Sequence, residues 1–151
     1  MSIKNEIVVT DWIKRNPNEG NFIKLTLSSD QRRIVRGKRK SDCNRELHLQ
    51  LPREGKLSDS DTLLTNQKGL FVKIIAQKEN LIEITSKTDL ELTKVAYHLG
   101  NRHVEIEINE NILFTKSDYV IEALLKNFEV NLTKVKKKFI PETGAFHHEK
   151  K

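Results

Sequence analysis

The stretch LIEITSKTDLELTKVAYHLGNRHVEIEI, residues Leu81–Ile108, decides the fold because its hydrophobic period changes twice. Apolar residues first alternate, which predicts a strand, and then recur at helical spacing from 92 to 99. Ser86, with an acidic residue three positions on, predicts the helix start, and Gly100 predicts a left-handed stop. Alternation resumes after His103. The stretch therefore predicts a strand, a helix and a second strand.

The chain after this stretch repeats the pattern. A tight turn at 109–111 leads into a return strand at 112–114. Ser117 or Asp118 is placed to cap a second helix, and residues 130–135 alternate as a last strand. The βαββαβ order predicts a ferredoxin-like sandwich, a fold that by itself names no function.

The first half of the chain predicts only strands. Alternation is clear in several short runs, and prolines and glycines punctuate the gaps between them, as expected where a chain reverses. We expect a small all-β unit of two packed sheets. The predicted strands are Ile7 to Val9, Phe22 to Leu27, Ile34 to Arg36, Glu46 to Leu51, Leu63 to Thr65 and Leu70 to Ala76.

The predicted fold class is therefore α+β, with a change of pattern near residues 77–80. We expect an all-β protein-interaction domain over 1–76 and a ferredoxin-like domain over 77–140. Residues 141–151 are expected to form a flexible tail that carries histidines. An exposed sheet edge in the first domain would suit docking of a protein partner.

Composition excludes several classes of protein. The single cysteine, Cys43, rules out an intrachain disulfide and any Cys-x-x-Cys motif, which suits a reducing compartment. No apolar run approaches the roughly 18 to 20 residues that cross a bilayer, and the first residues lack the apolar core of a signal peptide. Phosphate-loop, nucleophile-elbow and His-Glu-x-x-His motifs are absent from the sequence. We expect a cytoplasmic protein that is not an enzyme and has no membrane partner.

A net charge of +6 raises the alternative of a nucleic-acid-binding module. The densest basic cluster is Arg32–Lys40, but it contains no aromatic residue on which a base could stack. Its apolar members, Ile34 and Val35, favour a solvated strand and turn. We therefore expect no nucleic-acid partner, a point that salt-dependent retention on immobilised nucleic acid would test.

The histidines are the candidate metal ligands. Alternation places His103 on the face of its strand opposite the helices, and a solvent-exposed imidazole is mostly neutral at pH 7, so a lone pair is free for nickel or zinc. One histidine cannot hold such an ion, but a two-fold axis near it would supply a second copy. His147 and His148 in the tail are further candidates. For His98 a partly buried place on the helix is favoured over a ligand role, which stays the alternative, and His48 is assigned no chemistry.

Two motifs resemble the UreE family of urease accessory proteins. They are Gly100-Asn101-Arg102-His103 after the helix, and the run Phe139–Phe146 followed by histidines. The resemblance implies a cytoplasmic nickel metallochaperone that is a homodimer through its second domain. Its cargo would be Ni²⁺, delivered to the urease pre-activation complex, which includes the urease accessory GTPase UreG. Zn²⁺ or Cu²⁺ is also expected to bind in vitro.

The resemblance also implies roles for individual histidines. The residue that matches His103 is the shared metal ligand at the dimer interface, and tail histidines that match His147 or His148 complete the coordination. This chain lacks the long histidine-rich tail of some members. We therefore expect a single ion per dimer, held with modest affinity, and not nickel storage.

Overall fold

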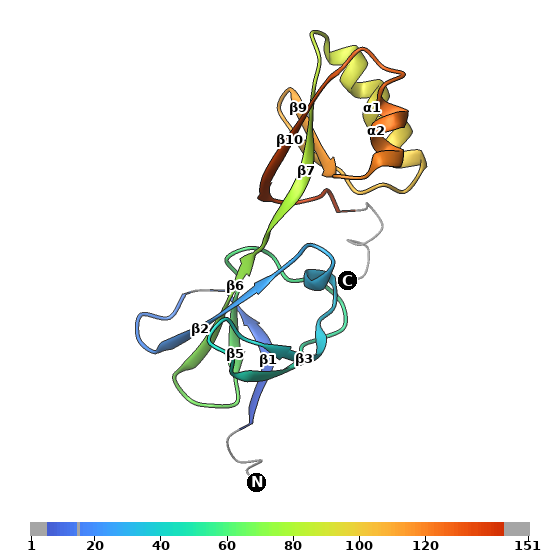
Figure 1. Cartoon of the computed structure of the whole chain (residues 1–151). Coiled ribbons are helices and arrows are strands. Elements are labelled where there is room, and N and C mark those ends of the chain that lie inside the picture. Colours follow the sequence, from blue (N-terminus) through green and yellow to red (C-terminus); the bar gives the residue numbers. More distant parts are fainter. Residues whose placement is uncertain (1–5, 15, 144–151) are drawn as a thin grey trace. The chain divides into compact units, whose positions relative to one another are not determined.

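The structure, a computed structural model, describes residues 6–14 and 16–143. The chain forms two compact units, of which one ends at Gln77 and the other begins at Lys78 (Figure 1). Among the described residues, the first unit contains strands and one short turn of 3-10 helix, and the second contains strands and two α-helices. The α+β class expected from the hydrophobic periods is confirmed.

The N-terminal unit is built on one six-stranded sheet with the order β2-β6-β5-β1-β4-β3. Two of its pairings, β1 with β4 and β2 with β6, are parallel, and the others are antiparallel. The prediction of two packed sheets was therefore wrong. The strands are β1 (Ile7–Ile13), β2 (Asn21–Leu27), β3 (Arg36–Lys40), β4 (Glu46–Gln50), β5 (Thr62–Thr65) and β6 (Leu70–Ala76).

This sheet curls until its two edge strands approach each other. Asp42, just after β3, donates its amide to the carbonyl of Lys24 on β2 at 2.9 Å, and its carboxylate accepts from the amide and the hydroxyl of Thr26 at 2.9 and 2.6 Å. The concave face encloses one apolar core that includes Leu25, Leu49 and other fully buried residues. These polar contacts join residues that are far apart in the sequence, so no local hydrophobic period predicts them. They bring the two edges of the sheet together, and the curled sheet covers its own apolar core.

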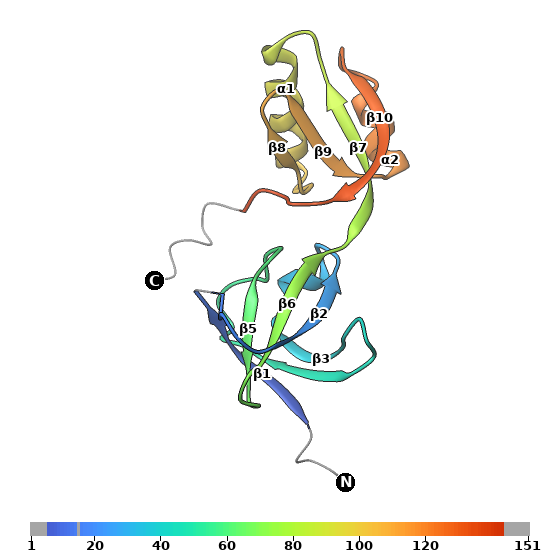
Figure 2. The ribbon, with the colours of Figure 1, turned by 90° about the vertical axis from the view of Figure 1, so that its left-hand side faces the viewer.

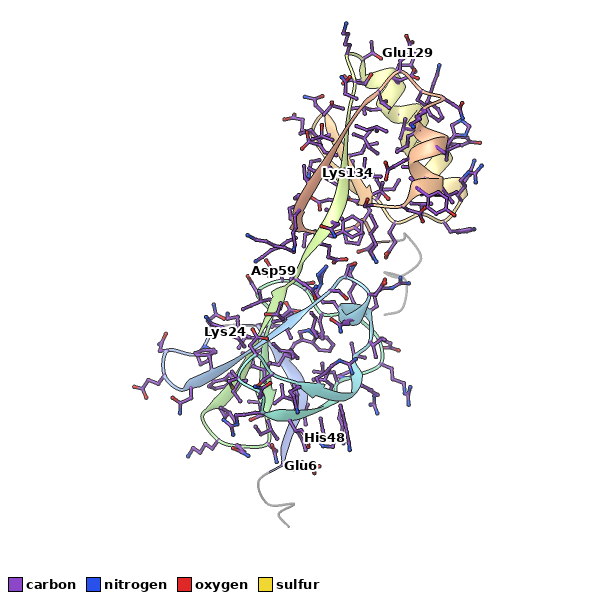
Figure 3. The ribbon with its side chains drawn as sticks, viewed as in Figure 1. Glu6, Lys24, His48, Asp59, Glu129 and Lys134 are labelled. Atoms are coloured by element: carbon purple, nitrogen blue, oxygen red, sulfur yellow. The ribbon has the colours of Figure 1, made fainter. Side chains whose placement is uncertain are left out.

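Outside the core, the N-terminal unit carries the basic cluster and His48. The expected strand at 34–36 is displaced: a 3-10 turn, η2 (Gln31–Arg33), precedes it, and β3 begins only at Arg36. His48 on β4 lies with its Nε2 2.8 Å from the Glu6 carboxylate (Figure 3). His48 therefore has a protein partner, the Glu6 carboxylate.

The C-terminal unit has the ferredoxin-like order expected from the sequence. Its sheet runs β10-β7-β9-β8, and each neighbouring pair is antiparallel. Figure 1 shows both helices on one face of this sheet. The elements are β7 (Lys78–Thr85), α1 (Asp89–Asn101), β8 (Glu107–Asn109), β9 (Ile112–Lys116), α2 (Tyr119–Leu125) and β10 (Asn131–Lys138).

The core of this unit lies between the sheet and the helices. Ile82 and Ile84 of β7 pack with Leu92, Val95 and Leu99 of α1, and all five are buried. Complete burial of such a side chain stabilises the fold by roughly 1.5 to 3 kcal/mol. The apolar spacing that predicted α1 is therefore the spacing of the residues that hold it on the sheet.

The two helix starts differ in how well the sequence predicted them. Asp118 caps α2, since its carboxylate accepts from the amides of Val120 and Ile121. The expected cap of α1 was wrong. Thr88, not Ser86, accepts from the Glu91 amide. The Ser86 hydroxyl instead donates to the carbonyl of Glu129, a residue labelled in Figure 3.

The chain beyond β10 forms a strap, residues 139–142, that crosses the sheet face opposite the helices. Phe139 is completely buried against Leu81 of β7 and Phe114 of β9. Farther on, the amide of Glu142 donates to the carbonyl of Ile106 at 2.7 Å, just before β8. The strap thus runs from one edge strand past both inner strands to the other edge (Figure 2).

Candidate metal centre

His103 lies in the turn that ends helix α1. The amide of His103 donates to the carbonyl of Gly100, and the amide of Val104 donates to the carbonyl of Leu99, both at 3.0 Å. This pair of bonds, with Val104 packed in the core that contains Leu99, is a Schellman helix end. His103 occupies the position of that motif where glycine is preferred, and its φ is 60°.

The expected stop at Gly100 was therefore wrong by three positions. Gly100 remains inside α1, and the left-handed conformation falls on His103. A side chain in this region of backbone space costs about 1 to 2 kcal/mol relative to the right-handed helix. Residues with such backbone strain occur preferentially at functional sites. Here the hydrogen bonds of the helix end hold His103 in this conformation, and its imidazole is exposed.

The prediction that His103 begins a strand was also wrong. β8 starts only at Glu107, because the helix end takes up residues 102–104 and the carbonyls of Glu105 and Ile106 accept hydrogen bonds from the Thr115 hydroxyl and the Glu142 amide. Val104 and Ile106 pack on the helices as expected, but Ile108 is 47% exposed. His103 is not part of a strand, so the alternation of side chains along a strand does not determine the direction of its imidazole.

Four residues after His103, the Glu107 carboxylate forms the centre of a polar cluster. Lys137 Nζ lies 2.8 and 2.9 Å from its two oxygens, and the amides of Ile140 and of the Asn109 side chain donate at 2.9 and 2.8 Å. Lys137 Nζ also lies 4.1 Å from the centre of the Phe114 ring. Glu107 was expected on an open surface, but the strap covers it and only 7% of it is exposed.

The charge of Glu107 is set by these neighbours. Burial alone would raise the pKa of its carboxyl, but the hydrogen bonds from Lys137, Ile140 and Asn109 and the positive charge of Lys137 together lower it below its usual value of 4.5. The carboxylate is therefore ionised at neutral pH. A charged, fully bonded carboxylate is a strong anchor for the groups that donate to it.

The described chain ends beside the segment that joins the His103 turn to β8. The Glu142 amide is bonded to Ile106, three residues along the chain from His103, and Thr143 is the last residue described. The expected ligands His147 and His148 lie outside the described residues. From Glu142 to His147 is five residues, which span at most about 17 Å when extended.

No complete metal site is present in the described part of the chain. Within residues 6–14 and 16–143, no group of three or more His, Cys, Asp or Glu side chains is placed to hold an ion. An ion at His103 would therefore need ligands from residues 144–151 or from a second copy. His98 is exposed on α1, with its ring 5.4 Å from that of Phe128.

Sequence reasoning missed the Glu107 anchor and the strap. Its only local signal was the phase of the alternation, which places Glu107 on the face away from the helices. That face was taken to be open.

The basic cluster gives an exposed strand edge at Arg36, Lys38 and Lys40. None of the helices in the described chain is long and apolar enough to cross a membrane.

The fold and the His103 turn define a protein of two small units whose second, ferredoxin-like unit presents an exposed imidazole at a helix end. A family model described as the C-terminal domain of the UreE urease accessory protein matches residues 79–151. Three relatives are each named urease accessory protein UreE. The protein of Prochlorococcus marinus subsp. pastoris (strain CCMP1986 / NIES-2087 / MED4) is 80% identical over all of this chain and 98% of its own length.

The other two relatives lie farther away. The protein of Prochlorococcus marinus (strain MIT 9301) is 63% identical over 99% of this chain and 100% of its own length. That of Synechococcus sp. (strain CC9311) is 41% identical over 82% of this chain and 80% of its own length. The chain belongs to the UreE family of urease accessory proteins. It is an accessory protein and not an enzyme.

Proposed function

We propose that this chain is a homodimeric metallochaperone that binds Ni²⁺ at its dimer interface and delivers it for maturation of the urease active site. Membership of a urease accessory family supports the general role. The observation that carries the metal assignment is His103, an exposed imidazole on a backbone fixed by the end of α1. Imidazole nitrogen is a ligand that suits nickel, copper and zinc.

The proposed site contains His103 from each chain, with His147 or His148 completing the coordination. The strap supports this arrangement, since it ends beside Ile106 and only five or six residues separate Glu142 from His147 and His148. Two exposed isoleucines, Ile108 and Ile140, flank the Glu107 anchor at the edge strand β8. Apolar side chains at a strand edge favour a contact with a second copy there.

A metal site with only a few rigid ligands is suitable for a carrier protein. A site closed by a full set of fixed ligands would hold nickel too tightly to release it, whereas a tail that must be ordered on binding lowers the affinity. The proposed recipients are the urease pre-activation complex and its accessory GTPase UreG. Because imidazole binds Cu²⁺ more strongly than Ni²⁺, and Zn²⁺ with similar strength, selectivity would come from those partners and from metal supply. We also propose a cytoplasmic location, which the presence of only one cysteine in the sequence supports.

Titration calorimetry of the purified full-length chain tests the metal assignment. We expect His103→Ala to lower the affinity for Ni²⁺ by at least about tenfold, since one lost ligand per chain removes two from a shared site. His48→Ala is the matched control, because this histidine is paired with Glu6 in the other unit. Equal affinities for wild type and His103→Ala would refute the proposal.

A further inference from the structure

We infer that the outer face of the N-terminal sheet is a docking surface for a protein segment that carries large apolar side chains together with carboxylates. The surface, called the Phe22 patch, lies on the neighbouring strands β2, β6 and β5. It consists of three apolar residues and two lysines, namely Phe22, Phe71, Leu64, Lys24 and Lys73. The inference goes beyond the proposed nickel site, which is assigned to the C-terminal unit.

The register of the sheet places the three apolar side chains in one row. Phe22 of β2 is the direct partner of Phe71 of β6, and Phe71 is also the partner of Leu64 of β5. Ile23 and Val72, the next residues along β2 and β6, belong to the core, so the row points to the outer face. Phe22 is 43% and Leu64 40% exposed, with the half-buried Phe71 between them. Exposed apolar residues gathered on adjacent strands mark an interaction surface, whereas single ones do not.

Two lysines border this row on one side. Lys24 and Lys73 are direct partners, two positions along β2 and β6 from the phenylalanines, so they point to the same outer face. Lys24, labelled in Figure 3, is exposed. Within the described residues, no carboxylate forms an ion pair with either ammonium group. The apolar row therefore lies beside two positive charges that the unit itself does not neutralise.

The Lys73 side chain is held in place at the border of the row. Its Nζ donates to Thr62 Oγ1 at 2.9 Å, to Asn16 Oδ1 at 3.2 Å and to the Ser60 carbonyl at 3.5 Å. It also lies 5.8 Å from the centre of the Phe22 ring. All three acceptors are uncharged, so the ammonium keeps its net positive charge. A side chain that is already ordered loses little conformational entropy when a partner binds.

The distribution of charge along the chain supports an acidic partner. Residues 1–77 contain 15 Lys and Arg against 9 Asp and Glu, whereas residues 78–151 contain 12 of each kind. The net charge of +6 therefore belongs entirely to residues 1–77. Such an excess attracts acidic partners and speeds their encounter. Asp11 of β1, the cross-strand partner of Leu64, is at the far end of the row. We therefore expect the partner's carboxylates to lie on the lysine side.

A protein segment fits the Phe22 patch better than a nucleic acid does. Stacking of a base requires an open aromatic face. Lys73 Nζ lies over the Phe22 ring, and Phe71 is packed so closely that a Cβ added to Gly20 would lie 2.6 Å from its Cε2 atom. The third apolar member, Leu64, is aliphatic. Apolar anchors beside a charged rim are typical of protein interfaces.

Fluorescence anisotropy of the full chain with a short labelled peptide, in which leucine and glutamate alternate, tests the inference. We expect this peptide to bind wild type. Two matched peptides, one alternating serine with glutamate and one alternating leucine with lysine, should bind at least about tenfold more weakly, because each keeps only one of the two features.

Substitutions of exposed residues then locate the binding surface. We expect Lys24→Glu and Leu64→Ser each to weaken binding of the leucine–glutamate peptide at least about fivefold, the loss found for a side chain that anchors an interface. Lys38→Glu and Ile34→Ser are the matched controls, because both residues are exposed in the same unit but lie outside the Phe22 patch. Lys24→Gln, which removes only the charge, carries the comparison if Lys24→Glu does not fold.

Three results would overturn the inference. The first is that wild type does not bind the leucine–glutamate peptide, or binds the serine–glutamate peptide equally well. The second is an equal loss for Lys24→Glu and Lys38→Glu, which would assign the attraction to the overall charge of the unit. The third is tighter binding of a labelled single-stranded RNA that Lys24→Glu weakens, which would assign the surface to nucleic acid. None of these results bears on nickel binding, which the calorimetry of His103→Ala tests separately.

Discussion

His103 combines two properties that rarely occur in one residue. Its backbone is in the left-handed region that favours glycine, and its side chain is exposed and offers a nitrogen ligand. The strain has no counterpart in local packing, since an exposed imidazole contributes little to the core. The simplest physical account is that this position is occupied for the sake of the imidazole and at some cost to stability.

Replacing His103 with glycine should therefore separate stability from metal binding. We expect His103→Gly to raise the free energy of unfolding by up to about 1 kcal/mol, because glycine adopts a positive φ without steric cost although it gains freedom when unfolded. The same variant should lose nickel affinity as His103→Ala does. Urea unfolding, with His103→Ala as the control, measures the difference.

A lower stability for His103→Gly than for His103→Ala would contradict this account of the turn. The sequence identified His103 as a candidate ligand but placed the strain at Gly100, because glycine is the usual residue at a left-handed helix end. Nothing in the local pattern indicates that the helix continues through Gly100 and that the left-handed residue comes three positions later, at His103. The ligand roles of His103, His147 and His148 stay predictions.

At the scale of elements, hydrophobic period predicted most of what the C-terminal unit contains. Each strand and helix of the βαββαβ order was expected, because each has an apolar side that packs on its neighbours. The strap was not expected as packed structure. Its buried Phe139 follows a strand rich in lysine, and the Glu107 carboxylate that anchors the strap lies 33 residues before Ile140 in the sequence. Contacts between such distant residues leave no hydrophobic period in the sequence from which they could be predicted.

The Glu107 anchor makes stability depend on pH. The pKa of Glu107 is lowered by folding, so the carboxylate stabilises the folded state above the ordinary carboxyl value of 4.5, and this contribution disappears as pH falls through the lower folded value. We expect wild type to exceed Glu107→Gln by about 1 to 2 kcal/mol in free energy of unfolding at pH 7. The two should converge as pH falls below the lowered folded value.

Chemical unfolding of both proteins from pH 7 to pH 3 measures this convergence. Glu110→Gln serves as the control, since an exposed turn carboxylate should give no comparable difference at any pH. A gap between wild type and Glu107→Gln that stays constant down to pH 3 would show that the anchor does not depend on the ionised carboxylate.

At the scale of the whole molecule, both units pair strands that are distant in the sequence, as β7 pairs with β10 in the ferredoxin-like unit. The N-terminal sheet is also closed on itself by long-range polar contacts, such as that of Asp42 with β2. The fold class was therefore predictable, and the single curled sheet was not. The homodimer stays a prediction. It rests on the argument that His103 alone cannot hold an ion and that a second copy of the chain would supply another imidazole.

Metal stoichiometry together with mass in solution tests the dimer. We expect a dimer with one Ni²⁺ per two chains, and we expect His103→Ala to stay dimeric while losing the ion. Light scattering with metal analysis, with and without nickel, makes the measurement. One ion per chain on a monomer would exclude a site shared across a two-fold axis.

The strap has a practical consequence for handling the protein. It brings the carboxyl end of the described chain beside Ile106, and the nine residues after Glu142 reach at most about 30 Å from there. A hexahistidine purification tag fused after Lys151 would start at most about 30 Å from Ile106 and would bring artificial imidazoles within reach of an ion at His103. Affinities measured on such a fusion would describe the tag, so a cleavable tag at the amino end is the sounder choice.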